Sequence, residues 1–184
     1  MSMCVHVPPR RRRRLPAALL APLATLAAVL IPAPAAHAAA SVTCTGTSHA
    51  TYSPGLTLTP RNVSSTETST LSSCTSTDPT LTSGSWFLSA TIPGASCNDV
   101  EVSPDGPLTV TWNNGNTSTA SLTYVLTITG GILQTVGTGT ITAGQFTGAT
   151  AVFTWVYAVN PLNCLASGGL TIQDGTLAAQ ITTL

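Results

Sequence analysis

The sequence predicts an all-β domain, built as a two-layer antiparallel β-sandwich and cross-linked by two disulfides. Three observations predict this class: apolar and polar residues alternate over short segments, turn residues separate those segments, and residues 39–184 contain 32 threonines. Threonine is β-branched, so it favours extended backbone, and its hydroxyl suits the solvent side of a strand. No stretch of the sequence repeats apolar residues at helical spacing for long enough to predict a helix in place of these strands.

The first 38 residues have the three parts of a secretory signal. Arginines at positions 10–14 form a positive region, residues 15–31 form an apolar stretch, and residues 36–38 read Ala-His-Ala, a small-x-small cleavage site. A membrane anchor is the alternative, but the apolar stretch has only 17 residues and contains two prolines. We therefore expect cleavage after this site, export, and a mature extracellular domain of residues 39–184 without a membrane span.

Charge in the expected mature domain is low and negative. Arg61 is its only basic residue against six acids, a formal charge of −5, and it contains no lysine. Proteins that bind nucleic acids or anionic lipids need lysine and arginine to displace counterions from phosphate groups. The composition therefore excludes nucleic acid and acidic membrane surfaces as expected partners.

The expected mature domain has an even number of cysteines: Cys44, Cys74, Cys97 and Cys164. An even number in an exported chain predicts two disulfides, for which three pairings exist. We expect Cys44 to pair with Cys74 in a modest loop, and Cys97 to pair with Cys164, joining an early turn to a late one. Zinc is the alternative, but no two cysteines are closely spaced and His49 is the only histidine of this domain.

The first half of the domain contains two expected strands. Residues 68–74 and 85–92 are predicted as strands, and turn residues occur before and after them at 52–55 and 103–106. Segment 60–84 as a whole is rich in serine and threonine. We therefore expect it to be a long excursion that is partly irregular.

The second half has the clearest strand signals. Residues 108–112 and 119–129 both carry apolar side chains at every second position, and the Asn-Gly step in 113–116 predicts a hairpin between them. Residues 132–141 are predicted as the next strand. Residues 149–159 are apolar on both faces, which predicts a central strand.

The chain ends with two short expected strands, 170–173 and 177–182, separated by the hairpin signal Asp174-Gly175. A turn is also predicted at 144–148. In total, eight to ten short strands with regular turns are typical of a two-layer, Ig-like sandwich. A closed barrel is the alternative fold.

The three tryptophans raise the question of a binding surface. Trp86, Trp112 and Trp155 each lie in phase with the apolar residues of their expected strands. Exposed tryptophans in a row stack on sugar rings, whereas tryptophans in phase with apolar neighbours pack in a core. We expect all three to be buried.

Several segments resemble small secreted, threonine- and serine-rich β proteins of actinomycetes. The resemblance depends on the arginine- and alanine-rich signal, Cys44-Thr45-Gly46, residues 52–57, Trp112-Asn113-Asn114-Gly115 and residues 144–148. It implies location and an Ig-like fold, and it assigns no activity. The enediyne-binding apoproteins are similar acidic sandwiches with two disulfides, but their bridges close short loops. No functional residue is transferred from either group.

Acidic residues offer the candidate chemistry. Asp99 and Glu101 are two apart, so on an extended strand they share a face, and with Asp105 or Asp174 they have the oxygen ligands that calcium prefers. The same pair has the composition of an acid and base couple. Acids that precede glycine are also typical of turns, which favours a structural role and leaves calcium as the weaker hypothesis. We expect no bound metal, no cofactor and no catalytic residue.

A serine hydrolase would need a histidine base, and His49 is the sole histidine available. The nucleophile motif Gly-x-Ser-x-Gly does not occur in the sequence. We therefore expect a secreted, non-enzymatic protein that acts through its surface, in adhesion or in structural contact with polysaccharide or an envelope protein. Carriage of a small apolar ligand is the second hypothesis, which an apolar cleft would support, and a secreted hydrolase is the third.

Overall fold

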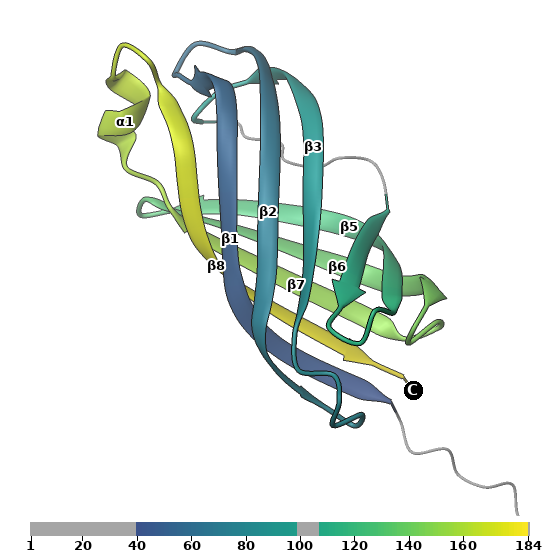
Figure 1. Cartoon of the computed structure of the whole chain (residues 1–184). Coiled ribbons are helices and arrows are strands. Elements are labelled where there is room, and N and C mark those ends of the chain that lie inside the picture. The colour runs from purple at the N-terminus through teal and green to yellow at the C-terminus, as the bar shows by residue number, and fades with distance from the viewer. Residues whose placement is uncertain (1–39, 99–106, 184) are drawn as a thin grey trace, which may run out of the picture. The chain divides into compact units, whose positions relative to one another are not determined.

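Eight antiparallel strands and one short helix form the computed structural model, which describes residues 40–98 and 107–183. Each strand pairs with the next one in the chain, and β8 pairs with β1, so the sheet closes into a barrel (Figure 1). Among these residues, no helix has the length and apolar character needed to cross a membrane. The elements are β1 (Ser41–Leu56), β2 (Arg61–Ser76), β3 (Gly84–Ala95), β4 (Leu108–Trp112), β5 (Thr117–Thr129), β6 (Ile132–Gly144), β7 (Thr150–Ala158), α1 (Pro161–Leu165) and β8 (Leu170–Thr182).

The predicted all-β class is confirmed, but the two-layer Ig-like sandwich is wrong. β1 pairs with β8 from Ser41 opposite Thr182 to Thr51 opposite Ile172, and this pairing joins the two edges of what would otherwise be a single open sheet. Six strands have 12 to 16 residues, about twice the usual length, which allows them to bend around a closed interior. Alternation in a sequence shows which face of a strand is buried, whereas closure depends on which strands exchange hydrogen bonds.

The hairpin predicted at 113–116 is confirmed, because it connects β4 to β5 and Gly115 has the positive φ of 83° that such turns require. The turn at 144–148 is confirmed between β6 and β7. The turn predicted at 52–55 lies instead within the irregular end of β1, and the one at 103–106 lies outside the described residues.

One further prediction holds only in part, and another is wrong. Residues 77–83 of the expected partly irregular excursion at 60–84 lie outside the strands, whereas residues 61–76 form β2, a 16-residue strand whose inward face carries serine and glutamate, so apolar alternation is masked. The expected hairpin at Asp174-Gly175 lies in the middle of β8, which continues through it. A Cβ at Gly175 would overlap the ring of Tyr157 on β7, so this glycine allows close side-chain packing and does not form a turn.

The barrel interior is packed in two apolar clusters. The larger one contains all three tryptophans, which are 2–6% exposed, as predicted. The smaller one lies around Leu56, Val63 and Leu170 and includes the disulfide between Cys97 and Cys164. The second predicted disulfide is also present, since Cys44 and Cys74 lie opposite each other on β1 and β2 and are bonded.

The barrel has one weakly paired junction, which determines where its interior approaches solvent. β3 pairs with the short strand β4 only at Gly84 and Ser85. In the part of the chain that the structure describes, β3 beyond Ser85 pairs with β2 alone, and β5 beyond Ala120 pairs with β6 alone. The inward faces of these two strand segments are therefore less covered than the rest of the interior.

The β6–β7 turn allows a matched pair of glycine substitutions. Gly144 and Gly148 both have positive φ, 83° and 88°, but a Cβ at Gly144 would overlap the carbonyl oxygen of Thr117, whereas a Cβ at Gly148 would meet no atom within 4 Å. Gly148→Ala is expected to lower the free energy of unfolding by about 1–2 kcal/mol, the conformational cost alone. Gly144→Ala is expected to cost at least about 2 kcal/mol more, because the β5–β6 pairing must also shift. Equal urea midpoints for the two variants would contradict the steric argument.

Candidate functional site

The barrel interior contains a pocket built around a buried carboxylate. It measures about 30 Å³, which is room for about two water molecules. Eight of the ten lining residues are buried, and the two that are partly exposed, Leu88 and Tyr124, lie on the weakly paired segments of β3 and β5. The pocket therefore faces solvent between these two strands. Its lining residues are Ala50, Tyr52, Ser65, Glu67, Leu88, Tyr124, Leu133, Thr135, Trp155 and Tyr157.

Strand register places Glu67 at the centre of this pocket. Its neighbours across the sheet are Ala50 on β1 and Leu88 on β3, and all three belong to the pocket lining. The inward face of β2 also carries Ser65 and Ser69 on either side of Glu67. Because Ala50 is small, space remains in front of the carboxylate.

Two glycines on neighbouring strands make room for the aromatic walls. Gly137 on β6 lies opposite Tyr124, and a Cβ there would be 3.0 Å from Cε1 of that tyrosine. Gly175 on β8 lies opposite Tyr157, and a Cβ there would overlap the tyrosine ring. Each tyrosine ring therefore lies over a glycine of the adjacent strand, which is a recurrent use of glycine inside sheets.

The Glu67 carboxylate is held by a chain of hydrogen bonds through one of its oxygens. Oε1 accepts from Nε1 of Trp155 at 3.0 Å and from Oγ of Ser69 at 2.6 Å. Oγ of Ser48 lies 3.0 Å from Oγ of Ser69 and 2.7 Å from the hydroxyl of Tyr157. The Ser69 hydroxyl has a single proton, and the carboxylate is the stronger acceptor. The arrangement that satisfies all these distances has Tyr157 donating to Ser48, Ser48 to Ser69, and Ser69 to Glu67.

The tyrosines of the pocket are held in their protonated form. Burial, and secondly the negative charge of Glu67, raises the pKa of Tyr52, Tyr124 and Tyr157 above the usual value, although the hydrogen bond to Ser48 partly offsets this for Tyr157. The hydroxyl of Tyr52 donates to Oε1 of Gln173 at 3.0 Å. The phenols therefore act as hydrogen-bond donors, not as bases, throughout the physiological pH range.

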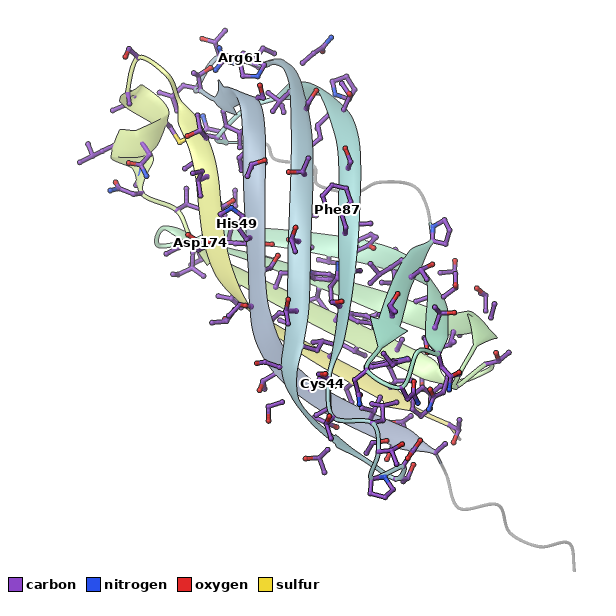
Figure 2. The ribbon with its side chains drawn as sticks, viewed as in Figure 1. Cys44, His49, Arg61, Phe87 and Asp174 are labelled. Atoms are coloured by element: carbon purple, nitrogen blue, oxygen red, sulfur yellow. A yellow bond between two sulfur atoms is a disulfide. The ribbon has the colours of Figure 1, made fainter. Side chains whose placement is uncertain are left out.

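Basic side chains do not neutralise this carboxylate within residues 40–98 and 107–183. The one ion pair of that part joins Nδ1 of His49 to Oδ1 of Asp174 at 2.6 Å, on the exposed face of β1 and β8. The guanidinium of Arg61, at the start of β2, donates to the carbonyl oxygen of Gly55. Figure 2 shows His49 beside Asp174 and Arg61 at the far end of its strand.

The chain was compared with known proteins. No protein-family model, curated protein or solved structure matches it.

The residues that the sequence singled out lie elsewhere. The calcium candidates Asp99, Glu101 and Asp105 lie outside the described residues. Asp174, their further candidate partner, pairs with His49 on the outer face. Among the residues that are described, no three His, Cys, Asp or Glu side chains lie close enough together to hold a metal ion.

Sequence reasoning missed Glu67, which it counted only as one of six acids. A signal was present, because Ser65, Glu67 and Ser69 alternate in phase with Val63 and Leu71. All five are buried and face the interior. A strand that has apolar residues at both ends of its inward face and polar residues between them indicates a polar pocket inside an otherwise apolar core.

The pocket combines one acidic side chain with hydroxyl groups and aromatic rings. Among its described lining residues there is one carboxylate and no histidine, so neither a carboxylate pair nor a histidine base is available. What it presents is a negative charge, hydroxyl groups and aromatic faces. Groups of this kind fix the orientation of bound molecules in ligand pockets.

Proposed function

We propose that this chain is an exported, non-enzymatic binding protein that holds a small ligand inside its barrel. The observation that carries the proposal is the Glu67 carboxylate, 9% exposed, in a pocket walled by aromatic rings. Burying a carboxylate is costly unless partners compensate for the lost water. A buried ionisable side chain inside a pocket is a recurrent feature of binding sites.

The ligand of this pocket is polar, in contrast to the apolar ligand considered from the sequence. A space of about 30 Å³ is well below the 300–1,000 Å³ of pockets that enclose whole apolar ligands. A carboxylate and several hydroxyls would be left without partners by an apolar occupant, which weakens binding. The pocket therefore favours a compact polar group.

Adhesion through the outer surface is the second candidate function. Leu162 and Leu165 lie on one side of α1 and are 70% and 65% exposed, and Phe87 on β3 is 64% exposed (Figure 2). Exposed apolar side chains of this size support contact with a partner surface. They form only a pair on a five-residue helix and one ring on β3, so they support this role less than the pocket supports ligand binding.

The binding proposal is tested by native mass spectrometry of protein recovered from the growth medium. We expect a mature mass that begins at Ala39, with both disulfides formed, and an added mass that is lost on denaturation. Ala50→Val adds two methyl groups to the pocket, about the space of its two waters, and is expected to remove the added mass.

Ala158→Val is the matched control, because Ala158 is exposed at the end of β7. This variant should retain the added mass. A wild-type protein without added mass, or an Ala50→Val protein that carries the same mass, would contradict ligand binding in the barrel.

A further inference from the structure

We propose that the ligand is a primary alkylammonium compound. Its ammonium group binds beside Glu67, and its aliphatic chain lies over the partly exposed leucines between β3 and β5. This inference depends on the proposed function and names the ligand class of the same pocket. It is carried by the charge, the hydrogen-bonding groups and the size of the site.

The first argument is the missing positive charge. Both hydrogen bonds that Glu67 accepts from described side chains end on Oε1. No described side chain donates to Oε2, and none in this part of the chain supplies a cation. Buried carboxylates are stabilised by a paired cation together with hydrogen bonds. A cationic ligand would supply the charge that the protein lacks.

The second argument is the set of groups around the carboxylate. An ammonium group has three N–H donors and no acceptor. Besides Glu67, the hydroxyls of Ser65 and Thr135 line the pocket, each residue is 6% exposed, and neither forms a side-chain hydrogen bond within the described part of the chain. A carboxylate oxygen and two hydroxyl oxygens match the three donors of a primary ammonium.

The third argument is the aromatic wall. The rings of Tyr124 and Trp155 have centroids 6.1 Å apart and are tilted by 48°, so their faces form an angled wall of the pocket. Aromatic faces attract ammonium ions, and the attraction is stronger where water is excluded. A phosphate, sulfate or carboxylate ligand would be repelled by both the ring faces and Glu67.

The fourth argument is size and shape. A space for two waters accommodates the ammonium nitrogen and one carbon, so the rest of the ligand must lie in the opening. Leu88 on β3 lines the pocket, and Leu122 and Leu126 lie two residues on either side of the lining residue Tyr124 on β5; all three are partly buried and pack against the larger apolar cluster. An aliphatic chain would cover them, which explains why a linear alkylammonium fits better than a bare ammonium ion.

The test follows the indole N–H resonance of Trp155 by NMR, because this proton lies on Oε1 of Glu67. The oxidised mature domain is titrated at pH 7 with methylammonium, n-butylammonium and n-butanol. We expect n-butylammonium to shift the resonance with an affinity at least about tenfold above that of n-butanol, its neutral analogue. The affinity of n-butylammonium should also exceed that of methylammonium by about tenfold, because its additional methylene groups contact the leucines.

Two variants test where the ammonium group and the aliphatic chain of the ligand bind. Glu67→Gln keeps the shape of the side chain and should lower the n-butylammonium affinity by at least about tenfold. Leu126→Ser should reduce the advantage of the butyl over the methyl compound by about threefold, whereas Val125→Ser, on the exposed outer face of the same strand, should leave it unchanged. Circular dichroism of each variant establishes that it is folded before the titration.

The outcomes separate this inference from the proposed function. Equal binding of n-butanol and n-butylammonium, insensitive to Glu67→Gln, would overturn the alkylammonium inference and leave a ligand-binding barrel in place. A resonance that none of the three compounds shifts would also overturn it, and the added mass in the native spectrum would then decide whether another ligand occupies the pocket. If the native spectrum of the wild-type protein also shows no added mass, both proposals are overturned.

Discussion

Replacing Cys97 and Cys164 together with alanine is expected to lower the free energy of unfolding by about 4 kcal/mol, a large share of the roughly 5–15 kcal/mol that is typical of a domain. The two cysteines are 67 residues apart in the chain, so their bond restricts a large part of the unfolded state. They also belong to the smaller apolar cluster, where few other side chains hold the end of the barrel together. Urea denaturation followed by circular dichroism measures the loss.

The second disulfide is the matched comparison. Cys44 and Cys74 are 30 residues apart and already lie opposite each other in a long hairpin. Their double alanine variant is expected to lose about 3.5 kcal/mol, somewhat less than the first. We also expect hydrogen exchange at the amides of Leu56 and Leu170 to accelerate only when the Cys97–Cys164 bond is removed. Equal exchange in both variants would contradict a local role for that bond.

Alkaline pH is expected to unfold the domain over a narrow range above pH 10. Burial raises the pKa of Tyr52 and Tyr157 in the folded state, whereas in the unfolded chain each loses its proton near pH 10. The folded state therefore binds more protons above pH 10, and its stability falls as the pH rises. This contribution is complete below pH 10 and is lost as the pH rises through the folded pKa values.

The expected slope is large because two tyrosines contribute together. Each tyrosine lowers the free energy of unfolding by about 1.4 kcal/mol per pH unit, so the two together lower it by about 3 kcal/mol for each unit above pH 10. Circular dichroism between pH 8 and pH 12, with recovery on return to pH 8, measures the transition. Tyr52→Phe removes one of the two groups and should reduce the slope by about half. A titration in which all tyrosines ionise near pH 10 while the ellipticity stays constant would contradict the argument.

The sequence was sufficient for the all-β class, the disulfide pairing and the burial of the tryptophans. The strands and the buried tryptophans follow from alternation between residues that are close together in the chain. The disulfides follow from cysteine spacing, because four cysteines allow only three pairings. Closure of the sheet did not follow, because β1 and β8 have the same alternation whether they pair with each other or face solvent at an edge. The hairpin predicted at Asp174-Gly175 was wrong for a related reason. Gly175 leaves room for the ring of Tyr157, which lies on another strand.

The candidate site was hidden because it is built across six strands. Glu67, Tyr124 and Trp155 are distant in the sequence and meet only when the barrel closes. An isolated glutamate in a serine- and threonine-rich segment resembles a solvated side chain, and burial of such a residue is rare. Only the register of β1, β2 and β3 shows that this carboxylate faces inward between Ala50 and Leu88.

The order of strands around the barrel has a consequence for how the chain folds. Every junction but one joins strands that are consecutive in the sequence, and the exception is the pairing of β1 with β8. Hairpins between consecutive strands close short loops and form fast, whereas joining residues 41–56 to 170–182 requires most of the chain to be ordered first. We therefore expect closure of this seam to limit the refolding rate. Until it closes, β1 and β8 are free edges, and during this interval the chain is exposed to pairing with a second copy.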